Sequence, residues 1–325
     1  MPKYNCVSIG NSTVDIILKS SEFKIVKNSN FTTGTAICEI FDSKVNVDNM
    51  FISSGGGATN TACGLSHFGL KTSCISKVGT DSLSEVIIDD LNKFGVDFDN
   101  LSFVKNEKTA ISVVLTPDKG NLGRTALAYR PKGLGLDLLT LKNKEIDSEY
   151  AYITNLGSSF LNVKNVIDFV KSKNIKVYWN PGLNELDNID LSFMEKIDVF
   201  MVNIEEASKL ANLPTDNITA IFKFFTSKVK AQKMLITMGE KGAFYISSQN
   251  IYHISAYKVE IENTIGAGDA FGSGFLFALI KNMPIETCLE YAMKNATVTI
   301  TKTGAKERFL KNLNELPNPK IKKIK

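Results

Sequence analysis

Short β-like runs alternate with helical stretches through the second half of the chain, and this alternation restricts the fold more than any other feature. The runs rich in β-branched and aromatic residues are 151–154, 177–179, 199–202, 234–237 and 243–246. Helical patterns separate most of them, for example at 163–173 and 205–211. Such a rhythm is typical of a parallel sheet with helices on both faces. We therefore expect an α/β fold with a mostly parallel central sheet.

Two β-rich segments, about 12–52 and 105–130, interrupt this rhythm. The first alternates loosely and contains many Ser, Thr and Asn residues. The second has two strand-like runs around a turn at 117–120, where the sequence is Pro-Asp-Lys-Gly. We expect the two segments to form a small second sheet beside the main one.

Composition and charge narrow the class of protein. The chain has 325 residues, of which 43% are hydrophobic and 22% are charged, as in ordinary globular proteins with a sizeable core. These values exclude a collagen-like or wholly disordered chain. The net charge is 38 − 34 = +4, which is weak for a protein that must neutralise many phosphates. We therefore expect no nucleic acid partner.

The cysteines and the apolar segments bear on the compartment. The five cysteines, which form no C-x-x-C pair, are Cys6, Cys38, Cys63, Cys74 and Cys288. Their scatter suggests neither a zinc site nor a disulfide framework. The strongly apolar stretch 271–280 is too short to span a bilayer, and residues 1–5 begin no signal peptide. We expect a cytoplasmic protein that does not bind membranes.

The strongest chemical motif is Gly266-Ala267-Gly268-Asp269, which precedes a helix-like apolar run. Two glycines let backbone N–H groups approach an anion, and a helix start adds unpaired N–H groups and a positive dipole end. A carboxylate at this place does not bind the anion, so Asp269 makes sense as a base that deprotonates an attacking nucleophile. The alternative is an ordinary acidic residue that stabilises the helix start.

Two other phosphate-binding motifs are excluded. The pattern G-x-G-x-x-G fails because Phe271 stands where the third glycine is required. Gly64 and Gly69 have P-loop spacing, but Leu70 intervenes before the lysine. We therefore expect neither a Rossmann dehydrogenase nor a P-loop enzyme.

Five segments, in order along the chain, resemble the motifs of the PfkB family of carbohydrate kinases. They are GGGATNTA at 55–62, SKVGTD at 76–81, NIEE at 203–206, TMGEKG at 237–242 and GAGD at 266–269. The resemblance implies a single domain over 1–325 with a three-layer ribokinase-like fold. It also implies that the segments about 12–52 and 105–130 form a β-sheet lid over the acceptor site. A lid with an exposed edge could pair two copies as a homodimer.

The resemblance implies an ATP-dependent phosphotransferase that phosphorylates a hydroxymethyl group of a sugar. Asp269 would be the general base, and the backbone of Gly266, Ala267 and Gly268 would form the anion hole for the transferred phosphoryl group. The family motif usually begins with an aspartate of a monovalent-cation site, but this chain has Asn263 there. We therefore expect only a weak response to K⁺.

The nucleotide and the metal would lie near the later motifs. The residues that the resemblance assigns to nucleotide binding are Asn203, Thr237, Gly239, Gly242 and Asn295. Glu206 would hold Mg²⁺ through water, as suits an ion that keeps several of its waters. The alternatives are a helix-start acid for Glu206 and a tight turn for the glycines.

The acceptor would lie under the lid. The residues implied to bind it are Asn11, Asp15, Gly55, Gly56 and Asn60. Carboxylate and amide groups suit polyols because they accept hydrogen bonds from vicinal hydroxyls, and an amide also donates. For Asn60 alone, a structural amide at a helix start is the alternative. Arg130, or Arg124, could reach the acceptor or its phosphate from the lid.

Two alternative functions remain at this point. A nucleoside kinase would keep the mechanism and change the acceptor, because the GGGATNTA segment also resembles adenosine-kinase-like members. It would need an apolar wall for the base, and the sequence cannot place Phe31, Phe41 or Phe160 there. A catalytically silent regulator is the other alternative, against which the intact Asp269 motif argues.

Overall fold

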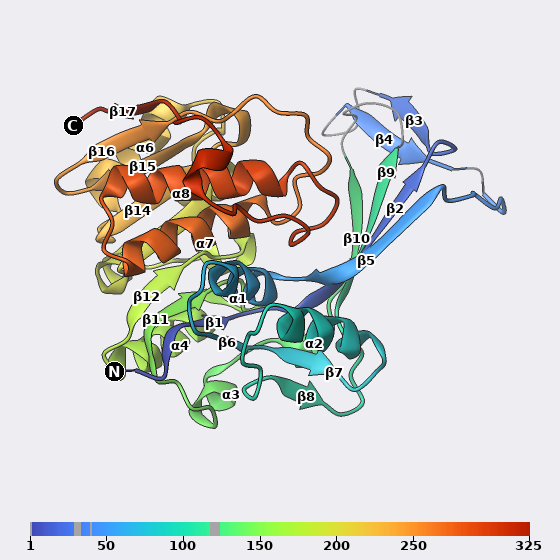
Figure 1. Cartoon of the computed structure of the whole chain (residues 1–325), viewed down its shortest axis with the longest axis horizontal. Helices are drawn as coiled ribbons and strands as arrows, with labels where there is room; N and C mark the ends of the chain where they lie inside the picture. Colours follow the sequence, from blue (N-terminus) through green and yellow to red (C-terminus); the bar gives the residue numbers. More distant parts are fainter. Residues whose placement is uncertain (1, 29–33, 40, 118–123) are drawn as a thin grey trace.

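The computed structural model describes residues 2–28, 34–39, 41–117 and 124–325, and its centre is a nine-stranded sheet (Figure 1). The strand order is β17-β16-β15-β14-β13-β12-β11-β1-β6. The bounds are β1 Tyr4–Ile9, β6 Thr72–Ile75, β11 Ser148–Ile153, β12 Lys176–Trp179, β13 Val199–Asn203, β14 Lys233–Thr237, β15 Ala243–Ser247, β16 Ile251–Ile254 and β17 Ile321–Lys323. Strands β6, β1 and β11 to β14 pair in parallel, and β15 to β17 continue antiparallel. The expected mostly parallel sheet is confirmed.

The central strands are largely apolar on both sides, because both faces of the sheet are covered. In β11, Ala151 and Ile153 belong to one buried cluster, and Tyr150 and Tyr152 belong to the other. Successive strand residues point to opposite faces, so a sheet buried on both sides needs a continuous apolar run. This is why these strands lack the polar alternation of a one-sided sheet.

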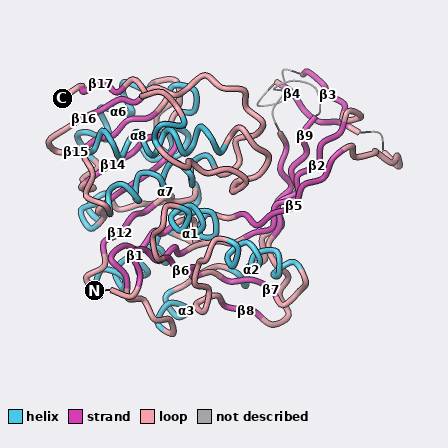
Figure 2. Tube along the Cα trace, viewed as in Figure 1, coloured by secondary structure: helices cyan, strands magenta, loops and turns pink. Residues whose placement is uncertain are grey.

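Helices form the two outer layers (Figure 2). Their bounds are α1 Gly57–His67, α2 Leu83–Lys93, α3 Leu138–Lys142, α4 Phe160–Ser172, α5 Ile204–Ala211, α6 Ile218–Lys228, α7 Ala267–Ile280 and α8 Ile285–Thr299, with 3₁₀ turns at Lys132–Leu134, Leu183–Leu186, Leu191–Lys196, Gly239–Lys241 and Leu313–Glu315. Side chains of α3 to α6 pack in the cluster of Ala151, and those of α1, α7 and α8 pack in the cluster of Tyr152. Within the described ranges, no helix combines the length and apolar character needed to cross a bilayer.

Helix α7 is buried on nearly every side, between the sheet and α8. Its close approach to β11 depends on Gly272, because a Cβ there would lie 1.9 Å from Oη of Tyr152. A helix that is apolar all round belongs in the interior. The packing fixes the position of its first turn, which carries Asp269.

A second sheet rises from the body, and we call it the lid after the expectation from the sequence (Figure 1). Its strand order is β10-β9-β2-β5, with bounds β2 Thr13–Ser20, β5 Asn49–Gly55, β9 Ile111–Pro117 and β10 Thr125–Tyr129. A two-stranded ribbon of β3 Lys24–Lys27 and β4 Thr35–Cys38 lies at its outer end. Strands β7 Lys77–Gly79 and β8 Ser102–Val104 form a separate parallel pair in the body, beside α2. Most of the turn expected at 117–120 lies outside the described residues.

The register of the lid separates two unlike faces. Asp15 pairs with Ser112 and Ile17 pairs with Val114, and this face looks toward the start of α7. Ile16, Ile52 and Leu127 share the opposite face through their pairing partners. The face toward the body therefore combines the polar Asp15 and Ser112 with apolar residues, whereas those three residues on the outer face are all apolar.

Candidate active site

The start of α7 presents bare backbone. Gly266 is the N-cap residue with φ 73°, a left-handed conformation that favours glycine. A Cβ on Gly266 would also lie 2.4 Å from Cβ of Ala305, so a side chain is excluded on two grounds. The first N–H groups of a helix have no intrahelical acceptors and lie at the positive end of its dipole. The segment from Gly266 to Gly268 can therefore stabilise an anion.

Asp269 lies in the first turn of α7 and is joined to α1 across 209 residues of sequence. Nδ2 of Asn60 donates a hydrogen bond to Oδ2 of Asp269 at 2.8 Å. Burial raises the pKa of Asp269 to about 6, although the Asn60 hydrogen bond and the charge of Lys306 oppose the shift. A carboxylate with such a pKa is ionised at neutral pH and is basic enough to accept a proton.

A cavity of about 300 Å³ lies between the lid and the body, directly over Asp269. The expected site residues that line it are Asn11, Asp15, Gly56, Asn60, Arg130, Gly266 and Asp269. Gly55 lies behind Asp15, and a Cβ there would be 2.1 Å from Oδ2 of that residue. We call this the acceptor cavity. The structure thus brings together residues from the first strand, the glycine run, the lid and α7.

Asp15 and Arg124 are charged side chains that line the acceptor cavity together with Asp269 and Arg130. Asp15 is 7% exposed, and Oγ1 of Thr13 donates to its Oδ1 at 3.3 Å. Burial raises the pKa of Asp15, while the charges of Lys306 and Arg124 oppose that shift. Arg124 reaches from the lid and donates to Oγ1 of Thr264 in the loop before α7. The bond between Arg124 and Thr264 joins the lid to the loop before Gly266 at the border of the acceptor cavity.

A second cavity of about 240 Å³ lies on the other side of the α7 start. Its lining includes the expected nucleotide residues Thr237, Gly239 and Gly242 together with Ala267 and Gly268 of the motif. The rest is largely apolar and includes Phe271, Met293 and Ile300. We call this the nucleotide cavity. The segment from Gly266 to Asp269 therefore lies between the two cavities and lines both.

Asn203 and Glu206 form a capping box at the start of α5. Oδ1 of Asn203 accepts from the backbone N–H of Glu206 at 2.9 Å, and Oε2 of Glu206 accepts from that of Asn203 at 2.8 Å. Burial raises the pKa of Glu206 to about 7, and the charges of Glu205 and Asp269 add to this. A nearby cation would stabilise the ionised form of this carboxylate.

The side chains near Glu206 fit an Mg²⁺ ion that is held mainly by its waters and by a bound phosphate. Among the described residues, no three His, Cys, Asp or Glu side chains cluster so that they could hold an ion by themselves. Mg²⁺ usually binds through one or two carboxylates, several waters and the phosphates of its substrate. Glu206 is suited to such an indirect role.

Asn295 lies apart from both cavities. It is fully buried on α8, where its Nδ2 donates to the carbonyl oxygen of Ala270 at 2.8 Å. Its Oδ1 accepts from the backbone N–H of Leu310 at 2.9 Å. These bonds join α7 and α8 to the following loop, so the side chain serves the packing around the site. It does not line the cavity with Thr237 and Gly239.

Sequence reasoning missed Lys306, which lies beneath the acceptor cavity and is 5% exposed. Its Nζ donates to Oδ1 of Asn60 at 2.9 Å and to the backbone carbonyl oxygen of Ser54. The carboxylate of Asp90 lies 3.8 Å away. No local signal distinguishes this lysine from the chain's many exposed lysines, because its segment is rich in charged and small residues.

Comparison with known proteins agrees with this geometry. The model of the pfkB family carbohydrate kinases matches residues 4–312. The deoxyribokinase of Salmonella typhi is 24% identical over 260 residues, 79% of this chain and 85% of that protein. The guanosine-inosine kinase of Exiguobacterium acetylicum is 23% identical over 276 residues, 83% of this chain and 91% of that protein. The structure of Arabidopsis thaliana ribokinase complexed with ribose and ATP superposes with a TM-score of 0.72 at 19% identity, covering 97% and 96% of the two chains.

Proposed function

Because the chain belongs to the pfkB family of carbohydrate kinases, we propose that it transfers the γ-phosphoryl group of ATP to the hydroxymethyl group of a sugar. Family membership and the ribokinase relatives make it an ATP-dependent carbohydrate or nucleoside kinase. One observation carries the finer proposal. The start of α7 separates a polar cavity, which contains Asp269, from a largely apolar cavity beside Thr237 and Gly239.

Asp269 acts as the general base in this proposal. It lines the acceptor cavity, where a hydroxyl group of the substrate can reach it. Asn60 holds one carboxylate oxygen, which leaves the other free to accept the hydroxyl proton. The nucleophilic oxygen then forms its bond to phosphorus as the bond to the ADP oxygen breaks.

The backbone of Gly266, Ala267 and Gly268 stabilises the negative charge of the transferred phosphoryl group. Gly266 faces the acceptor cavity, whereas Ala267 and Gly268 line the nucleotide cavity. Donors placed before the reaction need no reorganisation when charge develops, which is the main way an enzyme assists phosphoryl transfer.

The acceptor and the nucleotide are held by unlike groups. Asp15 and Asn11 offer oxygens and an amide to sugar hydroxyls, with Gly55 and Gly56 leaving room behind them. Asn60 already binds Lys306 and Asp269 and can donate its second N–H to the sugar. The apolar lining beside Thr237, Gly239 and Gly242 suits the flat faces of a base. When bound, Mg²⁺ neutralises phosphate charge, and Glu206 would hold its waters with help from Asn203. Asn295 supports α7 in this scheme.

A nucleoside acceptor is the second candidate, favoured by one relative. Of the aromatic residues considered for a base, Phe160 lines a further cavity next to the acceptor cavity, but its ring packs against Trp179 and Phe193. Phe41 is 92% exposed and lines none of these cavities, and Phe31 lies outside the described residues. The guanosine-inosine kinase relative acts by its name on nucleosides.

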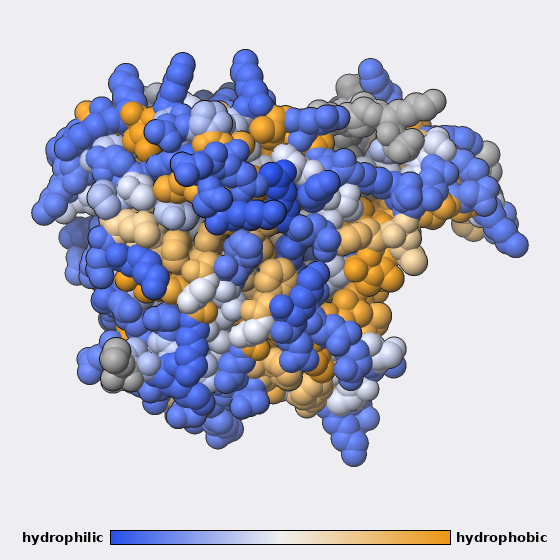
Figure 3. Space-filling model, viewed as in Figure 1, coloured by the Kyte–Doolittle hydropathy of each residue, from blue (hydrophilic) through white to orange (hydrophobic). Residues whose placement is uncertain are grey.

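We also propose that two copies pair through the outer face of the lid. On that face Met50 is 65% exposed, Ile52 is 44% exposed and Leu127 is 57% exposed. Figure 3 shows hydrophobic surface on the side of the lid that lies next to α2. Exposed apolar patches of this kind often mark protein interfaces. We place the enzyme in the cytoplasm, because its five free cysteines suit a reducing compartment.

The test is ADP release from Mg-ATP with a panel of pentoses, hexoses, sugar acids, sugar phosphates and nucleosides. Turnover of a sugar that is lost in Asp269→Asn supports the proposal, and turnover of nucleosides alone replaces it with the second candidate. ATP binding without turnover of any acceptor would contradict both and leave a silent regulator.

A further inference from the structure

A third cavity, of about 510 Å³, lies next to the acceptor cavity, which measures about 300 Å³. The residues common to both linings are Asn11, Thr13, Arg130 and Asn155. The two cavities therefore adjoin at these residues, and an acceptor whose hydroxymethyl group lies at Asp269 would extend toward this space past Asn11 and Arg130. Sequence reasoning did not foresee it, because its lining comes from segments far apart in the chain.

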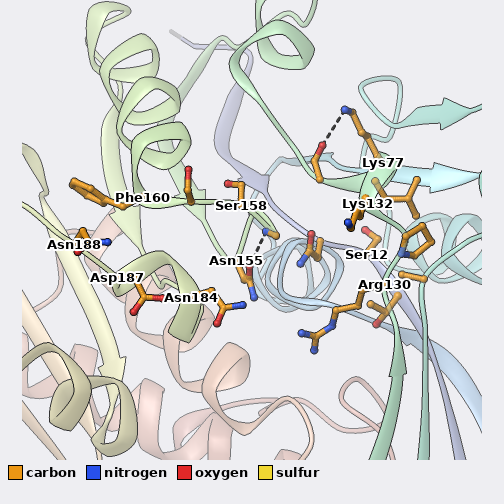
Figure 4. A pocket seen from close by; sticks show the side chains of 18 residues that line it. Ser12, Lys77, Arg130, Lys132, Asn155, Ser158, Phe160, Asn184, Asp187 and Asn188 are labelled. Atoms are coloured by element: carbon orange, nitrogen blue, oxygen red, sulfur yellow. Dashed lines mark hydrogen bonds between the residues drawn. The ribbon is translucent and has the colours of Figure 1, made fainter.

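The lining of this cavity is basic. Lys77, Arg130 and Lys132 are its cationic side chains, and Arg130 and Lys132 reach in from the lid side in Figure 4. Its acidic side chain, Asp187, is already paired with Nζ of Lys209 at 2.8 Å. Lys77 donates to the carbonyl oxygen of Gly135 at 3.0 Å and keeps further hydrogens to donate. We call this space the basic cavity.

The start of α4 adds to the positive potential of the basic cavity. Gly157, Ser158, Ser159 and Phe160 line it, and α4 runs for 13 residues from Phe160. The N-cap side chain of Ser159 makes no capping hydrogen bond. Cationic side chains and a helix N-terminus thus face the same space from opposite sides, an arrangement that favours an anion.

The basic cavity is a poor fit for a nucleobase. Its apolar lining is limited to Ala110, Pro131, Leu134 and Phe160. The ring of Phe160 packs against those of Trp179 and Phe193, and Phe160 is only 9% exposed. In Figure 4 it lies at the far end from Arg130. A base would meet cations and amides rather than the flat apolar walls that it prefers.

We propose that the acceptor carries an anionic group, a carboxylate or a phosphate, which binds in the basic cavity while the hydroxymethyl group lies at Asp269. The inference rests on the proposed function and names the class of its substrate. Arg130 spans both cavities, so it orients the acceptor, and Lys132 binds only the anionic end.

The test compares kcat/KM for neutral sugars, sugar acids and sugar monophosphates of matched carbon number. We expect an anionic acceptor to exceed its neutral analogue about tenfold or more, as for one charge-assisted hydrogen bond. The carboxylate and phosphate arms of the panel identify which anion is used. Lys132→Gln should lower the anionic-to-neutral ratio, and Lys322→Gln, which changes a lysine on β17, should not.

Two results would overturn this inference. A neutral sugar that is turned over as fast as its acidic and phosphorylated analogues leaves the kinase intact but removes the role of the basic cavity. An anionic preference that survives in both Lys132→Gln and Arg130→Gln places the anion elsewhere. Absence of turnover with every acceptor contradicts the proposed function itself, so the two failures can be told apart.

A second inference concerns the buried Lys306 and rests on separate contacts. Both ends of the Asn60 amide are used, since Oδ1 accepts from Lys306 and Nδ2 donates to Asp269. An ammonium group only donates, so it can pair with the oxygen of that amide and never with its nitrogen. Lys306 therefore selects the amide orientation that turns the NH₂ group toward the carboxylate.

Carboxylates surround the ammonium group of Lys306. Asp90 lies 3.8 Å from its Nζ and is itself held by the backbone N–H and Oγ of Ser54, at 2.9 and 2.7 Å. The charge of Lys306 opposes the rise that burial causes in the pKa of Asp15 and in that of Asp269. The cation thus lies between a structural carboxylate and the two carboxylates of the acceptor cavity.

We infer that Lys306 is a positioning residue, which orients Asn60 toward Asp269 and keeps a positive charge under the acceptor cavity. The other titratable groups facing Asp269 are Asp15 from the lid, Glu206 from α5, and Tyr152 and Tyr178 from the sheet. Asp15 and Glu206 are acidic and the tyrosines are neutral at ordinary pH. Arg124 and Arg130 also line the acceptor cavity. Removal of Lys306 takes away a cation whose charge opposes the rise in the pKa of Asp269, while Asp15 and Glu206 remain.

The test is the pH profile of kcat/KM for Lys306→Met and Lys306→Arg. We expect the acid limb to move to higher pH in Lys306→Met and to return toward the wild-type position in Lys306→Arg. The matched control is Lys294→Met, because Lys294 is also fully buried and pairs with Glu290 at 2.6 Å, on α8. Lys294→Met should lower the thermal stability of the protein without moving the acid limb of the pH profile.

If Lys306→Met does not fold, Lys306→Gln keeps a donor for Asn60 without the charge and is measured instead. An acid limb that stays at its wild-type pH in the folded neutral variant overturns the inference. So does an equal shift in Lys294→Met, which would make the effect one of general destabilisation. Loss of activity in Asp269→Asn remains the separate test of the base.

Discussion

The carboxylate of Asp269 is the group on which the proposed chemistry depends most. In Asp269→Asn the side chain keeps its shape and can still hydrogen-bond, but it can no longer accept a proton. We expect kcat to fall about 10²–10⁴-fold, as for loss of a general base. Steady-state ADP release measures this, and a melting temperature close to that of the wild type shows that the fold is kept. A variant with wild-type turnover would remove Asp269 from the mechanism.

The pH dependence of the wild type tests the same residue. Burial raises the pKa of Asp269 to about 6, and only the ionised carboxylate can accept the hydroxyl proton. The activity is therefore present above pH 6 and is lost as the pH falls through that value. We expect log kcat/KM to fall with a slope of about one per pH unit below the limb. A profile that is flat down to pH 5 would contradict this assignment.

Asn263 determines the expected response to monovalent cations. Its Oδ1 accepts from the backbone N–H of Ile265 at 2.9 Å, and its Nδ2 donates to the carbonyl oxygen of Lys302 at 3.2 Å. The amide is neutral and already paired, so it attracts a cation less than a carboxylate would. We expect equal rates in KCl and NaCl at one ionic strength. A large activation specific to K⁺ would show that a cation site persists without the acid.

At the scale of an element, the start of α7 depends on glycine at one position and tolerates a side chain at another. Gly266→Ala puts a Cβ against Ala305 in a left-handed conformation that costs about 1–2 kcal/mol for an L-residue. We expect lower thermal stability and a lower kcat. Gly268→Ala is the matched control, because its Cβ meets no atom within 4 Å.

Gly266→Ala should lower thermal stability, whereas Gly268→Ala should change nucleotide binding. Gly268 lines the nucleotide cavity, so the added methyl of Gly268→Ala should raise KM for ATP while the melting temperature stays unchanged. Steady-state kinetics and thermal melting separate the two effects. Equal stability of both variants would mean that the loop before α7 adjusts freely, against the close contact with Ala305.

At the scale of the whole molecule, the lid face predicts an assembly. Leu127→Lys places a charge on the apolar outer face, on the edge strand β10, and should shift sedimentation from a dimer to a monomer. Phe103→Lys is the control, since Phe103 is 52% exposed on β8, outside the lid sheet. A wild-type protein that sediments as a monomer at micromolar concentration would contradict the proposal.

Much of the architecture could be predicted from contiguous residues. The apolar runs that alternate with helical patterns predicted a mostly parallel sheet, because both faces of such a sheet are covered and the runs carry no polar alternation. The segment from Gly266 to Asp269 predicted a helix start with bare backbone, since glycine conformation and the helix dipole are local properties.

Only the tertiary structure decided which distant groups meet. Asn60 and Asp269 are 209 residues apart, and their hydrogen bond exists because α1 and α7 pack side by side against the sheet. In the sequence Lys306 resembles a surface lysine, but the fold buries it beneath the acceptor cavity. Asn295 resembles a site residue in the sequence, but in the fold it is buried and bonded to Ala270. Backbone preferences are determined by neighbours in sequence, whereas burial and charge pairing depend on where the packed elements bring the chain.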